Sequence, residues 1–202
     1  IEAGAGDDTV VAGAGNDSVF GDEGADDIDA GAGDDTVFGG DDADTISGGG
    51  DDDSLFGHAG ADSPMGDAGN DNLEGGAGDD TLEGGADADT LNGGADNDSL
   101  NGGSGDDSLL GSFGDDTLNG GTGADTLEGG FGDDTFEITD NFGDDQSFGE
   151  GDLETNGDTL DLSGVTTGVT VDLTSSNPED GSFTDGTSNA DFFDIENIIG
   201  VL

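Results

Sequence analysis

The chain has 202 residues, of which 52 are Asp or Glu and none is Lys or Arg, so its formal charge is −52. The lack of Lys and Arg excludes an ordinary nucleic-acid-binding surface, and the lack of Cys excludes disulfides and thiolate metal sites. Hydrophobic residues make up 29 % of the chain and 44 residues are Gly, which is little material for a core. No apolar run is long enough to span a bilayer. A compact fold with this charge needs bound cations.

The chain from Ala3 to Glu137 consists of fifteen nonapeptides without insertion or deletion. Representative units are GGAGDDTLE (75–83), GGSGDDSLL (102–110) and GGTGADTLE (120–128). Position one is always Gly or Ala, position four is Gly in eleven units and Asp in four, and position six is Asp in all fifteen. Position seven is nearly always Thr or Ser, and position eight is Val, Ile, Leu or Phe in fourteen units.

Each position of the nonapeptide has a predicted conformation. Glycines at positions one, two and four favour positive φ, which predicts a tight turn over the first six residues. Asp42, Asp51, Asp87 and Asp96 replace Gly at position four, and Asp tolerates the left-handed region better than most residues. Thr or Ser, then an aliphatic residue, then a variable one, predicts a short strand with an inward central side chain. Turn and strand in regular alternation imply a chain that coils on itself.

This pattern resembles the RTX family of glycine-rich nonapeptide calcium-binding repeats, GGxGxDxUx. The resemblance implies an all-β fold, a right-handed parallel β-roll or β-solenoid of about fifteen repeats, in which two nonapeptides form one coil. It also implies that Ca²⁺ lies between the turns of successive coils. Each position-six carboxylate would bridge two ions, and backbone carbonyls of the turns would supply further ligands. The calcium ligands implied by the resemblance are Asp8, Asp17, Asp26, Asp35, Asp44, Asp53, Asp62, Asp71, Asp80, Asp89, Asp98, Asp107, Asp116, Asp125 and Asp134.

Calcium is also the metal that these side chains favour chemically. Oxygen ligands suit a hard cation such as Ca²⁺, whereas transition-metal sites use His or Cys. If each ion joins repeat n to repeat n+2, fifteen repeats give 15 − 2 = 13 sites. One inward side chain per nine residues is a thin core, so we expect the metal-free chain to be disordered and to fold on binding calcium.

An 18-residue coil places every second repeat on the same side of the roll. Position nine then aligns Phe20, Phe38 and Phe56 about 4.8 Å apart, and position three stacks Phe113 on Phe131. Two interpretations are open: the aromatic side chains form a surface for self-association or protein contact, or they only stiffen the roll or lie under a neighbouring domain.

The seventh repeat, GHAGADSPM (57–65), departs furthest from the pattern. His58 stands at position two, and Pro64 occupies the inward position between Ile46 and Leu82, where it cannot donate a ladder hydrogen bond. We expect a locally weakened coil in which Met65 turns inward through a small bulge. His58 is not expected to bind metal, because Ca²⁺ favours oxygen.

After Glu137 the nonapeptide period is lost. Residues 138–157 are predicted to be a loop or irregular coil, and the alternation in 158–164, 169–175 and 192–202 predicts strands. We therefore divide the chain into a calcium-binding β-roll (1–137) and a β-rich cap or spacer (138–202) that leads into further repeats. The chain starts at Ile1, and we expect it to be part of a longer protein.

The sequence favours a structural function over catalysis. Calcium binding and solvation explain the many carboxylates, and the chain has one His, no Cys and no Lys. The resemblance implies a calcium-binding structural module of an extracellular or cell-surface protein of bacteria or archaea, such as an adhesin, surface-layer or matrix filament component. The alternative is a secretion and folding appendage of a secreted enzyme or toxin. Ice binding by outward threonines is weakly supported, because position three is mostly Ala and Thr122 is its only Thr.

Overall fold

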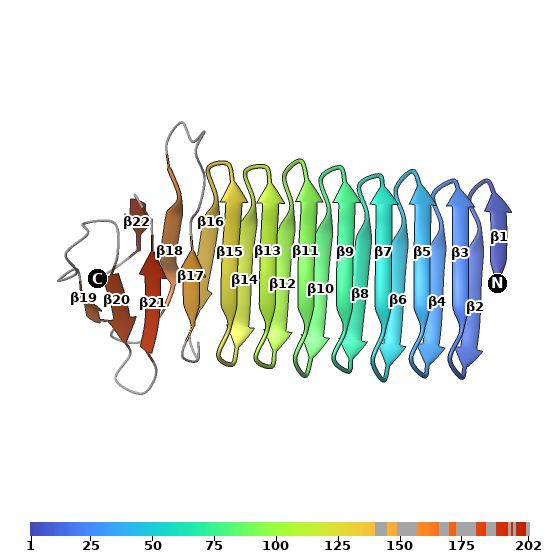
Figure 1. Ribbon diagram of the computed structural model, residues 1–202, viewed down its shortest axis with the longest axis horizontal. Coiled ribbons are helices and arrows are strands. Elements are labelled where there is room, and N and C mark those ends of the chain that lie inside the picture. The colour runs from blue at the N-terminus through green and yellow to red at the C-terminus, as the bar shows by residue number, and fades with distance from the viewer. Residues whose placement is uncertain are drawn as a thin grey trace.

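In the computed structural model the chain forms a long β-solenoid made of two sheets that face each other (Figure 1). The structure describes residues 1–139, 145–148, 157–165, 170–172, 181–184, 189–193, 195 and 197–200. All regular elements in these residues are strands. No helix long and apolar enough to cross a membrane occurs in the described residues. The predicted all-β parallel roll is confirmed.

The strands alternate between the two sheets along the chain. Sheet A contains, in spatial order, β1 (Glu2–Ala5), β3 (Ser18–Glu23), β5 (Thr36–Asp41), β7 (Ser54–Ala59), β9 (Asn72–Ala77), β11 (Thr90–Ala95), β13 (Ser108–Phe113), β15 (Thr126–Phe131), β17 (Gln146–Phe148), β21 (Asn189–Phe193), β20 (Gly181–Thr184) and β19 (Thr170–Asp172). Sheet B contains β2 (Thr9–Ala14), β4 (Asp27–Ala32), β6 (Thr45–Gly50), β8 (Ser63–Ala68), β10 (Thr81–Ala86), β12 (Ser99–Ser104), β14 (Thr117–Thr122), β16 (Thr135–Thr139), β18 (Thr159–Gly164) and β22 (Asn197–Ile199).

Successive coils pair in one register. Leu82 lies opposite Leu100 in sheet B and Leu91 opposite Leu109 in sheet A, each pair 18 residues apart. Pairing is parallel throughout both sheets, except that β20 is antiparallel to β21 and to β19. Two nonapeptides therefore form one coil, and the fifteen repeats make seven and a half coils.

The strands are longer than the sequence predicts. A typical strand, such as β10, has six residues and occupies positions seven, eight and nine of one repeat and positions one, two and three of the next. Only positions four to six turn the chain, so the predicted six-residue turn is wrong. The position-two glycines have positive φ, but they serve close packing: a Cβ at Gly31 would lie 2.0 Å from the carbonyl oxygen of Gly13 in the preceding coil. At position four the prediction is confirmed, because Asp42 and its three equivalents have φ between 75° and 78°.

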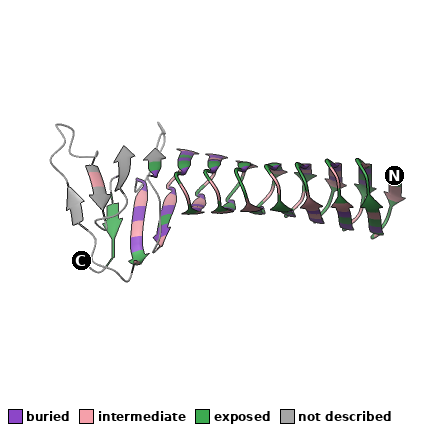
Figure 2. Ribbon diagram, turned by 90° about the horizontal axis from the view of Figure 1, so that it is seen from below, coloured by how far each residue is buried: buried purple, intermediate pink, exposed green. Residues whose placement is uncertain are grey.

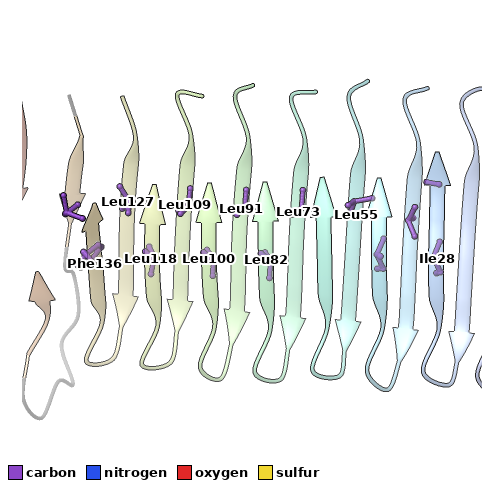
Figure 3. Close-up of a cluster of buried hydrophobic side chains, with 14 of the residues drawn as sticks. Ile28, Leu55, Leu73, Leu82, Leu91, Leu100, Leu109, Leu118, Leu127 and Phe136 are labelled. Atoms are coloured by element: carbon purple, nitrogen blue, oxygen red, sulfur yellow. The ribbon is translucent and has the colours of Figure 1, made fainter. Parts of the chain in front are cut away.

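The core consists of one row of position-eight side chains from each sheet (Figure 3). Buried and exposed residues alternate along the strands, so the rows point into the narrow space between the sheets (Figure 2). Most of these side chains are 0–1 % exposed. Sheet A contributes Val19, Val37, Leu55, Leu73, Leu91, Leu109 and Leu127, and sheet B contributes Val10, Ile28, Ile46, Leu82, Leu100, Leu118 and Phe136.

The seventh repeat keeps the register of its neighbours. Pro64 is buried opposite Ile46, as predicted. Met65 is 38 % exposed and lies opposite Ser47 and Glu83, so the predicted inward turn of Met65 through a bulge is wrong. Proline is compatible with extended backbone at this position, which leaves the alternation of the strand intact.

The tail continues both sheets beyond the nonapeptides. β17 and β21 extend sheet A, and β18 and β22 extend sheet B. The predicted strand at 158–164 is confirmed by β18, and the segments 169–175 and 192–202 contain β19 and β22. β17 lies in the segment predicted as loop or irregular coil, which is a correction. Residues 140–144 and 149–156 of that segment are outside the described residues, as are 169, 173–175, 194, 196 and 201–202 of the two later segments.

Candidate calcium sites

The turns of the roll bring the position-six aspartates into two columns, one along each edge where the strands of the two sheets connect (Figure 1). Turns that lead from sheet A to sheet B carry one column, and turns that lead back carry the other. The first column contains Asp8, Asp26, Asp44, Asp62, Asp80, Asp98, Asp116 and Asp134, and the second contains Asp17, Asp35, Asp53, Asp71, Asp89, Asp107 and Asp125.

Each aspartate is fixed to the next coil by two hydrogen bonds. The backbone N–H of Asp62 donates to Oδ1 of Asp80 at 2.7 Å, and the N–H of Thr81 donates to the Asp62 carbonyl oxygen at 2.9 Å. The N–H to Oδ1 bond recurs in thirteen successive pairs, from Asp8–Asp26 to Asp116–Asp134, at 2.7–2.9 Å. This pairing holds every carboxylate in the same orientation.

The second carboxylate oxygen is buried without a hydrogen-bond donor. Oδ2 has no partner in twelve of the aspartates, and these side chains are only 1–3 % exposed. A buried charged oxygen without a partner is strongly unfavourable, so each of these atoms calls for a proton or a cation. The twelve are Asp26, Asp35, Asp44, Asp53, Asp62, Asp71, Asp80, Asp89, Asp98, Asp107, Asp116 and Asp125.

The position-one glycine leaves room for this oxygen. A Cβ at Gly75 would lie 2.3 Å from Oδ2 of Asp80 and 2.7 Å from the carbonyl oxygen of Gly93 in the next coil. The same overlap with Oδ2, at 2.3–2.5 Å, occurs at position one from Gly21 to Gly120. The small space at the position-one glycine is therefore bordered by a carboxylate oxygen of the same repeat and a backbone carbonyl oxygen of the next coil.

Burial raises the pKa of these carboxyl groups. The pKa of Asp89 and Asp98 is raised to about 7, mainly by desolvation and further by neighbouring aspartates, against the lowering effect of the backbone N–H bond. The pKa is raised to about 6, with desolvation as the largest cause, for Asp44, Asp53, Asp80, Asp107 and Asp116. Without a cation, burial thus shifts these groups toward the protonated acid relative to a solvated aspartate.

The oxygen atoms fit a hard divalent cation better than a transition metal. Within the described residues, no group of three or more His, Cys, Asp or Glu side chains converges on one point. Backbone carbonyl oxygens are therefore needed to complete the coordination of any ion in the columns, as Ca²⁺ accepts. At the N-terminal end Asp8 and Asp17 are only half-buried, because no described coil precedes theirs.

The tail adds two aspartates that the nonapeptide pattern does not include. Asp125 donates its backbone N–H to Oδ1 of Asp145 at 3.1 Å, and Asp134 donates to Oδ1 of Asp158 at 2.8 Å. Both are buried, at 3 % and 0 % exposed. They continue the second and first columns after steps of 20 and 24 residues in place of 18. The sequences GDDQSF (143–148) and NGDTLD (156–161) carry the signal, a Gly-x-Asp or Gly-Asp followed by a strand.

A second set of polar contacts lies on the outer surface of the turns, at position five. These exposed side chains accept backbone N–H bonds from the following coil, as Asp79 does from Asn97 at 3.0 Å. Such a contact lowers the pKa of Asp52, and the largest cause of this lowering is the hydrogen bond from the backbone N–H of Asn70. Unlike position six, these carboxylates are already stabilised by donors and solvent.

A search of curated proteins gave no match. Among solved structures, the chain is similar to a hyperactive, Ca²⁺-dependent, β-helical antifreeze protein from an Antarctic bacterium, with 26 % identity over 78 % of this chain and 71 % of that one and a TM-score of 0.46.

The model of the RTX calcium-binding nonapeptide repeat matches four times, over residues 2–37, 29–64, 65–100 and 101–136. Each match spans 36 residues, which is four nonapeptides or two coils. The matches together cover the whole regular part of the roll, and this chain belongs to the RTX calcium-binding nonapeptide repeat family.

Proposed function

We propose that the chain is a calcium-binding structural module of an extracellular or cell-surface protein, such as an adhesin, surface-layer or matrix filament component, that folds on binding Ca²⁺. The observation that carries this proposal is the pair of columns of buried Oδ2 atoms without donors. A fold that buries twelve such oxygens at neutral pH needs cations to balance them.

The position-six aspartates are the proposed ligands. In each column, the space between successive aspartates would take one ion, which gives seven intervals from Asp8 to Asp134 and six from Asp17 to Asp125, together 7 + 6 = 13. Asp145 and Asp158 would add one interval to each column. Oδ1 keeps the neighbouring coil in register, Oδ2 supplies the negative charge, and backbone carbonyls complete the oxygen ligands.

The charge and composition support a chain that folds outside the cell. With 52 acidic residues and no Lys or Arg, the metal-free chain repels itself, and calcium is abundant outside cells and scarce inside. The matched family is a calcium-binding repeat and not a catalytic one. Residues 138–202 serve in this proposal as a cap or spacer, and Phe20, Phe38 and Phe56 form a contact surface.

Calcium titration followed by circular dichroism tests calcium-driven folding. At pH 7.5 in chelator we expect a disordered spectrum, and on adding calcium a cooperative gain of strand signal. A strong strand spectrum in excess chelator would contradict the proposal.

A matched pair of variants tests the ligands. Asp80→Asn removes the charge of a column oxygen, and Asp79→Asn removes a charge from the exposed neighbouring residue of the same turn. We expect Asp80→Asn to lose up to two bound ions by calorimetry and to need several-fold more calcium to fold, while Asp79→Asn resembles the native chain. Equal effects of the two changes would refute the assignment of position six.

A further inference from the structure

The outer face of sheet A over β3, β5 and β7 departs from the repeat at several positions together. Position nine is Phe in all three strands. At position two, Asp22 and His58 adopt positive φ of 80° and 81° where Gly is usual. At position three, Glu23 and Asp41 replace the usual Ala. In β9 and β11 these positions return to Glu or Asn, Gly and Ala. The strands β9, β11 and β13 pair in the same register without the substitutions, so roll formation does not account for them.

Most of these residues, Phe56 excepted, line an open groove of about 890 Å³. Phe20 and Phe38 form its apolar part, and Gly4, Ala5, Asp22 and Asp41 are among the other residues that line it. Its volume is in the range of pockets that hold a small ligand or a few side chains.

The aromatic side chains present a stacking surface at one end of a ladder. The ring centroids of Phe20 and Phe38, and of Phe38 and Phe56, are 5.0 Å apart with interplanar angles of 12° and 11°. Phe38 is covered by a ring on each side, whereas Phe20, among the described residues, has a ring neighbour only in β5. On its other side lies β1, with Glu2 opposite Phe20. A planar group stacked on Phe20 would thus continue the ladder and meet the Glu2 carboxylate.

The charge around the groove selects the sign of the ligand. Asp22, Glu23 and Asp41 line it, Glu2 lies beside it, and the chain has no Lys or Arg that could pair with them. His58, whose ring lies 5.7 Å from that of Phe38, is the only side chain of the groove that can carry positive charge. A second copy of this chain would bring the same acidic face, so like charges oppose that occupant.

We propose that this groove binds arginine side chains of a partner protein. A guanidinium group is planar and permanently charged, stacks on aromatic rings, and pairs with carboxylates in a fork geometry that an ammonium group lacks. It would stack on Phe20 and pair with Glu2 and Asp22. This inference does not depend on which extracellular role the module has.

The test uses the calcium-loaded chain and a labelled peptide with the sequence Gly-Arg-Gly-Arg-Gly, followed by fluorescence anisotropy at low salt. A citrulline peptide, which keeps the shape without the charge, is the ligand control. Phe20→Ser and Glu2→Gln remove groove contacts, and Phe113→Ser removes an exposed stacked Phe elsewhere on sheet A. Circular dichroism checks that all variants fold at the same calcium concentration.

We expect saturable binding of the arginine peptide and at least tenfold weaker binding of the citrulline peptide. Phe20→Ser and Glu2→Gln should each lose two- to fivefold in affinity for the arginine peptide, as for a cation–π contact or ion pair at an exposed site. Phe113→Ser should bind as the native chain does. Equal losses in Phe20→Ser and Phe113→Ser would mean general attraction to an acidic surface and overturn the proposal. Equal binding of the citrulline and arginine peptides would overturn the proposal as well. So would self-association of the chain that requires Phe20 and displaces the arginine peptide.

Discussion

The aspartate at position six divides its two oxygens between two tasks. Oδ1 of Asp80 accepts the backbone N–H of Asp62, and Oδ2 is buried with no donor. The sequence predicts that this residue is special, because it recurs in all fifteen repeats. It cannot predict the division of tasks, because that depends on how the next coil stacks. In the folded roll each carboxylate holds one donor from the neighbouring coil, so coil stacking and ion binding orient the same group.

Pro64 interrupts the row of aliphatic side chains that points into the core. The pairing of β8 with β6 begins at Ser63, whereas its pairing with β10 begins at Met65. Replacing Pro64 by Leu would restore a backbone donor and enlarge the buried apolar surface between Ile46 and Leu82. We expect Pro64→Leu to raise the free energy of unfolding of the calcium-loaded roll by about 1 kcal/mol, measured by urea titration in saturating calcium.

The number of bound ions should be unchanged in Pro64→Leu, because Asp62 keeps its place in the column. A less stable variant would show that the space opposite Ile46 fits proline and is overfilled by leucine.

At the level of the element, the glycines at positions one and two of the repeat lie in the strands and meet different structural requirements. The sequence indicates flexible glycines and so predicts a long turn. In the structure, position one lies inside the strand, and its lack of Cβ makes room for Oδ2 of the aspartate in the same repeat. A glycine needed for space cannot be told from a glycine needed for turning by sequence alone, which explains why the predicted strands were too short.

Two glycines of β6 separate these requirements. A Cβ at Gly48 would lie 2.4 Å from Oδ2 of Asp53, whereas a Cβ at Gly50 would meet nothing within 4 Å. We expect Gly48→Ala to lower the stability of the calcium-loaded roll by about 1–3 kcal/mol and to weaken calcium binding. Gly50→Ala should be neutral or slightly stabilising, since Ala is common at position three.

Thermal unfolding of the two variants at several calcium concentrations measures the difference. Ala30 already occupies position one in β4 and is fully buried, so the effect of Gly48→Ala is a displacement of the carboxylate and not a loss of the fold. Identical curves for the two variants would show that the carboxylate moves aside at no cost.

For the whole molecule, the fold and the alignment of the position-six aspartates could be predicted where the period holds and not beyond it. The core rows follow from aliphatic residues at position eight, and the two columns follow from aspartate at position six, each at a nine-residue spacing. Asp145 and Asp158 continue the columns at steps of 20 and 24 residues, so a search for a nine-residue period passes over them. Their place is set by pairing of β17 and β18 with the preceding coils, which is a tertiary constraint.

The raised pKa values predict the pH dependence of the metal-free chain. In the unfolded chain these aspartates titrate near 3.8, and in the fold the pKa of Asp89 is about 7 and that of Asp80 about 6. Well below pH 3.8 both states are protonated and burial carries no charge penalty. As the pH rises from about 4 to 7 the unfolded state ionises first, so the fold loses about 1.4 kcal/mol per unit of pKa shift and carboxyl group.

We therefore expect calcium-free protein to have more strand structure and to resist urea better at pH 4.5 than at pH 7.5. With saturating calcium the order should reverse, because protons compete with the cation for the same oxygens. Circular dichroism on dialysed samples measures both. Greater stability of the metal-free chain at pH 7.5 would mean that the carboxylates are solvated and not buried.

The hydrogen bonds along the two edges give the roll a direction. At position six the amide of one coil donates to the carboxylate of the following coil, as Asp62 does to Asp80. At position five the direction is opposite, because the amide of the following coil donates to the side chain of the preceding one, as Asn97 does to Asp79. The two faces of a coil are therefore complementary and not equivalent. A coil stacks correctly only head to tail, and two rolls placed head to head would bring carboxylate against carboxylate and amide against amide.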